Sequence, residues 1–486
     1  MTISRRSFIL NGVAASAALT GFLEGRYMQN ADAAFDVKNY SLEAKSTAKK
    51  PLAPTPPLGW NSYDSYRNAI DEAETLRNLE IFAKKLAPHG YEYFVLDYGW
   101  YSVNVGIPGS IRYTLPVIDY AIDSKGYPLS SPTFFPNGIK RIADRAHELG
   151  VKFGLHLFRG VIRKAWEFNV VSNKPPVRIR DIADTTAFTA WNDVTYGIDM
   201  TNDGAQEYYN GLIQHVAELG VDLLKIDDLV PYPAEVEAIG RAIAACERDI
   251  VFSLSPGNDT TPANNDSYQW GHMLRITSDV WDYQPSIDES FERWQVWQGS
   301  GKPGFWPDMD MLCLGTLTGM IDRTTDDLNS KLTPEELGRM DLEEVFFRKC
   351  HFTMAQERTF LTMRAMAASP LFMGGCLIRT EDRVMDLITN RDVLACNQNG
   401  VTGSFQCSRD SIDVWKTTKR SSAGSGWIGL FNRSGQAQSV VTLTLQDLGL
   451  PQANYRFRNI WSSEPFSLGQ TVSVDPNDVC FIEYLS

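Results

Sequence analysis

The stretch that decides the fold is residues 221–230, VDLLKIDDLV, a strand-forming run that ends in two adjacent acids. Side chains alternate between the two faces of a strand, so Lys225 and Asp227 share one face and Ile226 lies on the other. A buried strand whose polar face ends in an acid is typical of a parallel barrel, where functional groups gather at the carboxyl ends of the strands. This alternation predicts that Asp227 faces the barrel mouth. Asp228 has the opposite parity and is expected to have a structural role.

Seven further short apolar runs occur at intervals along the chain, in residues 58–63, 92–98, 152–158, 250–256, 273–279, 304–310 and 370–376. Helical patterns lie between them, in residues 71–88, 138–149, 204–219, 233–247, 289–299 and 335–367. Alternating strands and helices indicate parallel strands that are joined by crossovers. Eight such units predict an α/β fold, a closed (β/α)₈ TIM barrel over residues 58–400.

The texture of the chain changes near residue 400. Residues 401–486 contain short β-type runs with turn signals and no helical pattern, which predicts a C-terminal antiparallel β-sandwich. Within the barrel, the connection 159–203 is unusually long, and loops of this length are commonly functional. We expect it to cap the barrel mouth. Residues 34–57 are polar and Pro-rich at their end, as expected for a linker.

The first 33 residues have the features of an export signal. Residues 4–10, SRRSFIL, precede an Ala-rich apolar run and then a small-residue site at 31–33. Paired arginines before an apolar segment indicate the twin-arginine route. We expect a mature protein that starts near Ala34 and is periplasmic or secreted. An ordinary amphipathic helix is the alternative, and because twin-arginine substrates often carry redox cofactors, an exported oxidoreductase is a rival function.

The composition excludes several kinds of partner. The chain has 46 basic and 59 acidic residues, a net charge of −13, which argues against nucleic acid and anionic membranes. We find no run of eighteen or more apolar residues after the signal, so no membrane span is expected. The seven cysteines include no CxxC pair, which argues against a zinc or iron–sulfur site. The oligomeric state is not indicated by these features.

Acids end four of the eight predicted strands, and they are Asp97, Asp227, Asp279 and Asp310. Two carboxylates across a cleft suit glycoside hydrolysis, in which one attacks the anomeric carbon and the other protonates the leaving oxygen. Two other interpretations remain. The acids could form ion pairs with Lys225 and Arg275, or a divalent metal could bind among Asp227, Asp308 and Asp310.

Five motifs occur in the order and spacing of one enzyme family: LGWNSY, YFVLDYGWY, VDLLKID, LRITSD and FWPDMDML. In these motifs the chain resembles glycoside hydrolase family 27, the α-galactosidases and α-N-acetylgalactosaminidases. The resemblance implies a retaining enzyme with Asp227 as nucleophile, in a K-x-D motif, and Asp279 as acid/base, in an R-x-x-x-D motif. It also implies sugar contacts, and no cofactor or metal. The contact positions are Trp60, Asp97, Lys225, Arg275 and Asp310, and His156, also expected to bind the substrate, stands where the family commonly has a tyrosine.

Two positions depart from the family pattern and bear on the sugar. Tyr98 stands where the usual α-galactosidase has a second acid, and a ring there could crowd the exocyclic CH₂OH. Ser255 falls near the position where a small residue accommodates an N-acetyl group. We therefore expect a glycosidase for terminal α-D-galactosyl-type residues, with β-L-arabinopyranosidase or α-N-acetylgalactosaminidase as alternatives. A carbohydrate-binding protein without catalysis is the alternative from another class.

Overall fold

The computed structural model describes residues 52–104, 117–170, 177–188, 194–319 and 346–486. The predicted export signal and residues 34–51 of the predicted linker lie outside these ranges. Among the described residues, no helix has both the length and the apolar character needed to cross a membrane. All seven cysteines fall inside the described ranges, and each is a free thiol.

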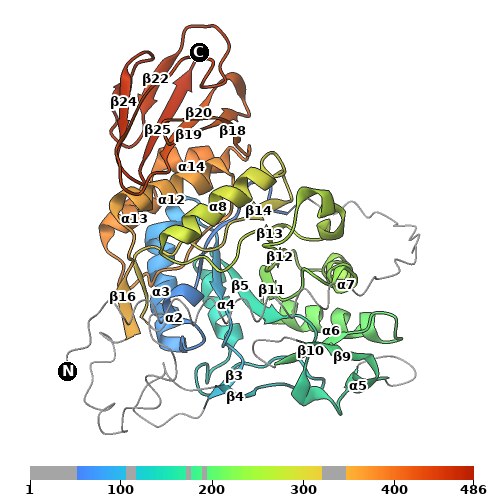
Figure 1. Ribbon diagram of the computed structural model, residues 1–486. Helices are drawn as coiled ribbons and strands as arrows, with labels where there is room; N and C mark the ends of the chain where they lie inside the picture. The colour runs from blue at the N-terminus through green and yellow to red at the C-terminus, as the bar shows by residue number, and fades with distance from the viewer. Residues whose placement is uncertain (1–51, 105–116, 171–176, 189–193, 320–345) are drawn as a thin grey trace, which may run out of the picture. The chain divides into compact units, whose positions relative to one another are not determined.

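The eight predicted barrel strands are all present, and they form one parallel sheet with the order β14-β13-β12-β11-β5-β2-β1-β17. Figure 1 labels the first five of these strands. Their bounds are β1 Leu58–Asn61, β2 Tyr93–Leu96, β5 Lys152–Phe158, β11 Leu223–Asp227, β12 Val251–Leu254, β13 Met273–Arg275, β14 Trp306–Asp308 and β17 Leu371–Met373. The segment after β14 then returns to β17, because Leu312 N donates to Phe372 O (2.7 Å) and Gly374 N donates to Leu312 O (2.9 Å). The predicted barrel is thereby confirmed.

Helices follow most of these strands, as the 3.6-residue patterns predicted. They are α3 Glu72–Ile81, extended by η1 Phe82–Leu86 and η2 Ala87–His89, then α4 Ile139–Glu148, α6 Ala205–Glu218, α7 Pro233–Ala245, α8 Gln284–Trp297 and α12 Met354–Met366. Short elements complete the set, namely α2 Tyr63–Tyr66, η3 Arg163–Ala165, α5 Ile179–Ile182, η4 Pro262–Tyr268, α13 Asp382–Ile388 and α14 Arg391–Gln398.

The predicted helix 335–367 is wrong in its described first part. Residues 335–345 lie outside the described ranges, and β16, Phe347–Lys349, pairs antiparallel with β15, Thr316–Thr318. The helix α12 begins only at Met354, because Thr353 and Gln356 form a reciprocal capping box at that point. The helices α13 and α14 after β17 were missed by the sequence analysis.

The long connection 159–203, which we expect to cap the barrel mouth, contains several small β elements in its described residues. They are β6 Val161–Ile162, β7 Asn169–Val170, β8 Val177–Arg178, β9 Ala183–Phe188 and β10 Thr195–Ile198, with sheet order β6-β10-β9 and a β7-β8 pair. The connection starts at the barrel mouth, because Arg159 N donates to Asp227 O (3.0 Å). A separate hairpin after β2 consists of β3, Ser102–Asn104, and β4, Val117–Tyr120.

The C-terminal part is antiparallel, as predicted (Figure 1). One sheet has the order β18-β19-β20-β25-β22-β23, and β21 pairs with β24. The bounds are β18 Ser404–Arg409, β19 Ile412–Lys419, β20 Ser422–Asn432, β21 Ser439–Thr442, β22 Arg456–Asn459, β23 Pro465–Phe466, β24 Thr471–Val474 and β25 Val479–Leu485. Trp294 of α8 stacks on Trp415 of β19 with ring centroids 3.7 Å apart, so this pair joins the barrel to the sandwich.

Candidate active site

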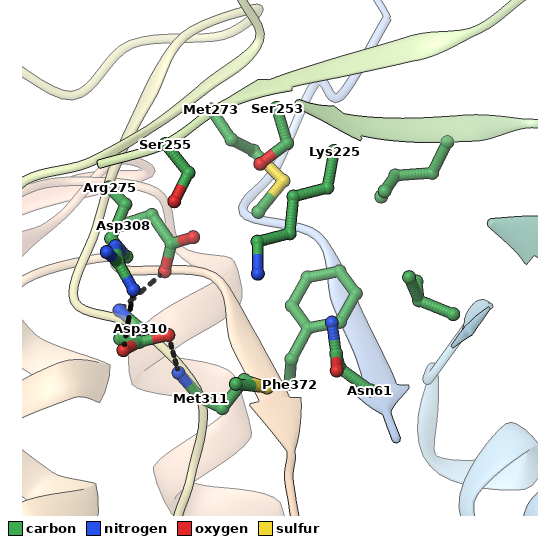
Figure 2. Close-up of a pocket in the computed structure, with 12 residues that line it drawn as sticks. Asn61, Lys225, Ser253, Ser255, Met273, Arg275, Asp308, Asp310, Met311 and Phe372 are labelled. Carbon is green, nitrogen blue, oxygen red and sulfur yellow. Dashed lines mark hydrogen bonds and ion pairs between the residues drawn. The ribbon is translucent and has the colours of Figure 1, made fainter. Parts of the chain in front are cut away.

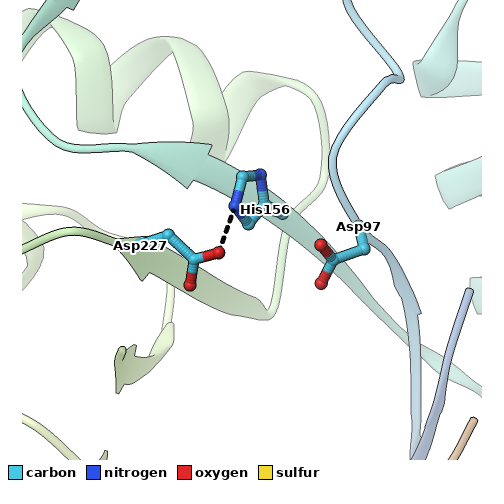
Figure 3. A group of neighbouring side chains, drawn as sticks. All are labelled: Asp97, His156 and Asp227. Atoms are coloured by element: carbon cyan, nitrogen blue, oxygen red, sulfur yellow. Dashed lines mark hydrogen bonds and ion pairs between the residues drawn. The ribbon is translucent and has the colours of Figure 1, made fainter. Parts of the chain in front are cut away.

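The carboxyl ends of β2, β5 and β11 bring four polar side chains together at the barrel mouth. The registers of the parallel strands place Lys225 beside His156. Lys225 Nζ lies 2.9 Å from Asp97 Oδ2 and 3.7 Å from Asp227 Oδ1. On the other side, His156 Nε2 lies 3.0 Å from Asp227 Oδ2 (Figure 3). The predicted residues Asp97, His156, Lys225 and Asp227 therefore form one contiguous cluster.

Asp97 is held by groups that the sequence analysis did not select. Asn61 Nδ2 donates to Asp97 Oδ2 (2.7 Å), and Asp97 N donates to Ser62 Oγ (3.0 Å). Its second oxygen accepts from Tyr98 N (2.8 Å). Asn61 was missed because every residue of β1 is buried, so the sequence has no polar alternation there to distinguish the two faces.

The electrostatics of the cluster keep Asp227 ionised. Burial alone would raise the pKa of this carboxyl, but Lys225 and His156 hold the pKa well below its usual range. The pKa of Asp97 behaves in the same way. Burial would raise it, but Lys225 and His156 lower it below its usual value. Among the described residues, Asp227 Oδ1 accepts no hydrogen bond. Asp227 is therefore an ionised carboxylate whose buried Oδ1 lies 3.7 Å from the Lys225 ammonium.

The same cluster is the described part's one three-residue grouping with metal-ligand geometry. Asp97, His156 and Asp227 each offer a ligand atom, and these atoms lie within 4.8 Å of one another. However, the Lys225 ammonium already stands between the two carboxylates, at 2.9 and 3.7 Å. A second cation there would meet this buried positive charge. The metal alternative raised from the sequence grouped Asp227 with Asp308 and Asp310 instead, which is not the grouping found.

A second cluster is organised by Arg275 at the end of β13. Arg275 NH1 lies 2.7 Å from Asp279 Oδ1 and 3.3 Å from Asp310 Oδ2. Asp310 is fixed further, because its Oδ2 accepts from Val280 N (3.0 Å). The Asp279 side chain is 70% exposed, whereas that of Asp227 is 20% exposed. An exposed acid beside a buried carboxylate cluster can exchange protons with a leaving group and with water.

Asp279 and Asp310 lie at the barrel mouth for a reason other than the predicted one. Strand alternation predicted that both acids lie within strands. In the structure β13 ends at Arg275 and β14 ends at Asp308, so both acids lie in the following loops. Asp310 adopts φ +69°, a left-handed conformation outside any strand. Hydrogen bonds and ion pairs therefore position these two acids, and the alternation of side chains along a strand does not.

Trp60 is a second correction. Its side chain is completely buried, its indole N–H donates to Gly375 O (2.8 Å), and its ring stacks on Phe94 with centroids 4.5 Å apart. A side chain without exposed surface has none to offer to a sugar. Its neighbour Asn61 is the β1 residue that lines the cavity at the barrel centre. Trp60 is therefore a supporting residue of the barrel wall in this structure.

Tyr98 lies at the barrel mouth on the side of His156. Its ring packs on Phe158 at 5.0 Å and on His156 at 6.1 Å between centroids, and its hydroxyl lies 2.9 Å from the Tyr120 hydroxyl. Only 9% of Tyr98 is exposed. The position that carries a second acid in the usual α-galactosidase is therefore occupied here by a fixed aromatic ring.

A cavity of about 30 Å³ lies among the barrel strands and shares Lys225, Arg275 and Asp310 with the two clusters (Figure 2). Its lining includes Lys225, Arg275 and Asp308 of the barrel strands, together with Ser255 and Asp310 from the loops that follow β12 and β14. Ser255 Oγ has no hydrogen-bond partner among the described residues. This space suits one or two water molecules and is too small for a sugar ring. Asp227 and Asp279 are not among the residues that line this cavity.

Asp308 is a further titratable residue that lines this cavity. Burial and the neighbouring Asp310 raise the pKa of Asp308 to about 7. Its Oδ1 accepts from Asp310 N at 3.0 Å. Its inward parity was visible in the sequence, but the sequence has no signal for a carboxyl whose pKa is raised by its surroundings.

A TIM barrel with paired acid clusters at its mouth and an antiparallel C-terminal domain defines a class of carbohydrate-active enzyme. The comparisons with known proteins agree. Residues 409–483 match the family model of the alpha galactosidase C-terminal beta sandwich domain. The structure superposes on a GH27 β-L-arabinopyranosidase from Geobacillus stearothermophilus, in complex with arabinose, with a TM-score of 0.77. That protein is 32% identical, and the match covers 89% of this chain and 98% of the other.

Two other relatives are similar. A Bacillus halodurans protein with a provisional α-N-acetylgalactosaminidase assignment is 30% identical, with a TM-score of 0.74 over 90% of this chain and 98% of its own. The α-galactosidase D of Emericella nidulans is 24% identical over 87% of this chain, and the chain spans 55% of that enzyme's length. The chain therefore belongs to glycoside hydrolase family 27, and it is a glycoside hydrolase.

Proposed function

We propose that this protein is a retaining exo-glycosidase that removes terminal residues of the α-D-galactosyl configuration. The observation that carries the proposal is the Asp227 carboxylate, which Lys225 and His156 keep ionised while its Oδ1 is left without a hydrogen bond. In the first step Asp227 attacks the anomeric carbon while Asp279 protonates the leaving oxygen. In the second step Asp279 deprotonates a water molecule, which displaces Asp227 with net retention.

The ring of Tyr98 favours one sugar of this configuration. β-L-Arabinopyranose is α-D-galactose without the exocyclic CH₂OH, so it needs less space at the aromatic wall formed by Tyr98 and Phe158. The similarity to the Geobacillus stearothermophilus β-L-arabinopyranosidase supports the same choice. We therefore expect a higher kcat/KM on β-L-arabinopyranosides than on α-D-galactosides.

N-acetylgalactosamine is the less supported alternative. Ser255, the residue considered for the acetamido group, opens on a cavity of only about 30 Å³. An acetamido group has four heavy atoms and does not fit a space of one or two waters. Because the chain is similar to the Bacillus halodurans protein, an α-N-acetylgalactosaminide is included among the substrates to be tested.

Three aryl glycosides decide the sugar: nitrophenyl β-L-arabinopyranoside, α-D-galactoside and α-N-acetylgalactosaminide. We expect turnover of the first two and little of the third. Turnover of none of them would favour the alternative of a carbohydrate-binding protein without catalysis. An NMR spectrum of the first product should show the anomer of the substrate, because a double displacement retains configuration.

Substitution of Asp227 tests the mechanism. Asp227→Asn should fold and lose activity, and Asp227→Gly should regain turnover with azide, which would form a glycosyl azide. Asp228→Asn is the matched control, because Asp228 adopts φ +61°, which Asn also tolerates. Wild-type turnover by Asp227→Asn would exclude this carboxylate as the nucleophile.

Export by the twin-arginine route is also part of the proposal. It is supported by the sequence SRRSFIL at residues 4–10 and the apolar segment behind it. Replacing both Arg5 and Arg6 with Lys should leave the full-length protein in the cytoplasmic fraction. Unchanged export of that variant would assign the route to a different signal.

A further inference from the structure

The C-terminal domain contains a groove that is separate from the barrel mouth. It has a volume of about 460 Å³ and is lined by residues of β22 to β25, the turn after β22, and Arg358 of α12. Three of its strands, β22, β24 and β25, are labelled at the top of Figure 1. A volume of several hundred Å³ is in the range of sites for small organic ligands. The groove is therefore large enough for one or two sugar units.

Two aromatic rings face this groove and both are held in place. Trp461 is partly exposed, its indole Nε1 donates to Thr362 Oγ1 (3.1 Å), and its backbone N donates to Asn459 Oδ1 (3.0 Å). Phe466, also partly exposed, packs edge-on against Phe457 at 5.9 Å. Fixed, half-exposed aromatic rings offer flat apolar surface at a low entropic cost, which suits the C–H face of a sugar ring.

The charges around the groove select against anions. Its lining includes the acids Glu464, Asp475 and Asp478. The single cation among the lining residues is Arg358, whose Nε donates to Asp478 Oδ1 at 3.0 Å and whose NH2 contacts the other oxygen of the same carboxylate. With its cation paired and its rim acidic, the groove repels phosphates and acidic polymers. Carboxylate and amide groups on the rim are suitable partners for neutral hydroxyls.

We propose that this groove is a binding site for a neutral polysaccharide chain, which it holds independently of the barrel mouth. The two fixed rings can pack on a sugar ring, and the carboxylate and amide groups can bind its hydroxyls. The pairing of Arg358 with Asp478 fits a ligand without negative charge. The inference relies on membership in a glycoside hydrolase family, and it does not depend on which sugar the barrel removes. Its effect is to keep the enzyme on a polymer without changing the chemistry on small glycosides.

The experiment is affinity electrophoresis of the full chain in gels that contain a soluble neutral arabinogalactan. Asp227→Asn is the parent, so that the polymer is not trimmed during the run. Trp461→Ala and Phe466→Ala are introduced separately into this parent, and we expect each to weaken retention about tenfold. Tyr455→Ala is the matched control, a partly exposed aromatic of the same domain that does not line the groove.

The outcomes separate the groove from the barrel and from misfolding. In the wild-type background, both groove variants should hydrolyse nitrophenyl glycosides at the parental rate and keep the parental melting temperature. Equal retention of the parent and both groove variants would overturn the proposal, as would a parent that the arabinogalactan does not retain. The same loss in Tyr455→Ala would also overturn it, because the effect would then belong to the domain as a whole. If the wild-type enzyme hydrolyses none of the nitrophenyl glycosides, the proposed function is contradicted. The retention measurement would still test the groove, because it does not depend on hydrolysis.

Discussion

Asp308→Asn is the substitution whose effect follows most directly from the structure. The carboxyl of Asp308 is partly buried beside Asp310, and burial and the Asp310 charge raise its pKa from the usual 3.8 to about 7. The folded protein therefore retains a proton on this group between about pH 4 and pH 7 that the unfolded chain releases. Because the folded state binds more protons over that interval, stability falls as pH rises through it, and the loss is complete above pH 7.

The size of the effect comes from the same shift. A rise of about three pKa units corresponds to about 4 kcal/mol, at roughly 1.4 kcal/mol per unit, which is an upper bound for a group coupled to Asp310. Asn has nearly the same shape and cannot ionise, so this part of the pH dependence should vanish. Relative to wild type, Asp308→Asn should gain several kcal/mol of stability between about pH 5 and about pH 8.

Urea unfolding followed by tryptophan fluorescence, at a series of pH values, measures this difference. The exposed Asp386→Asn serves as a control for the same type of substitution at the surface of the protein. Parallel stability curves for wild type and Asp308→Asn would refute the reasoning, because they would mean that Asp308 titrates alike in the folded and unfolded states. Activity of the variant is not needed for the test.

Three further substitutions test other contacts. Lys225→Met removes a cation that keeps Asp227 ionised against burial, so the acidic limb of the kcat/KM profile should move to higher pH; an unmoved limb would contradict this role. Gly59→Ala places a Cβ within 2.5 Å of atoms of Phe372 and Tyr93 on the two adjacent strands and should cost about 1–3 kcal/mol in urea unfolding. Gly435→Ala, with no atom nearer than 3.5 Å, should be close to neutral. Trp294→Ala removes a buried ring stacked on the C-terminal domain and should cost about 3–5 kcal/mol by the same measurement; a loss under 1 kcal/mol would mean that the interface repacks.

The barrel could be predicted because its strands are short, buried and separated by amphipathic helices. Each of the eight predicted runs contains an observed strand. The predicted helix over 335–367 shows the limit. Its described residues 346–353 carry β16 and a cap at Thr353, and the pairing of β16 with β15 comes from a segment about thirty residues away in sequence. Pairing of this kind is a tertiary contact that helical periodicity does not encode.

In the candidate site, too, some features follow from the sequence and others only from the tertiary structure. The sequence by itself determined that Lys225 and Asp227 share the inward face of β11, because alternation is a local property of a hydrogen-bonded strand. Only the tertiary structure decided where Asp279 and Asp310 lie, because both follow the last paired residue of their strands and are positioned by Arg275 and by backbone amides.

Tertiary structure also decided which neighbours each side chain acquires. It directs Asn61 to the cavity and buries Trp60 in the wall, a choice that a wholly buried strand leaves open in sequence. It places Lys225 and His156 against Asp227 from different strands, and that contact keeps the carboxylate ionised. Charge state depends on burial and on distances between strands, so it is set when the barrel closes and not when each strand forms.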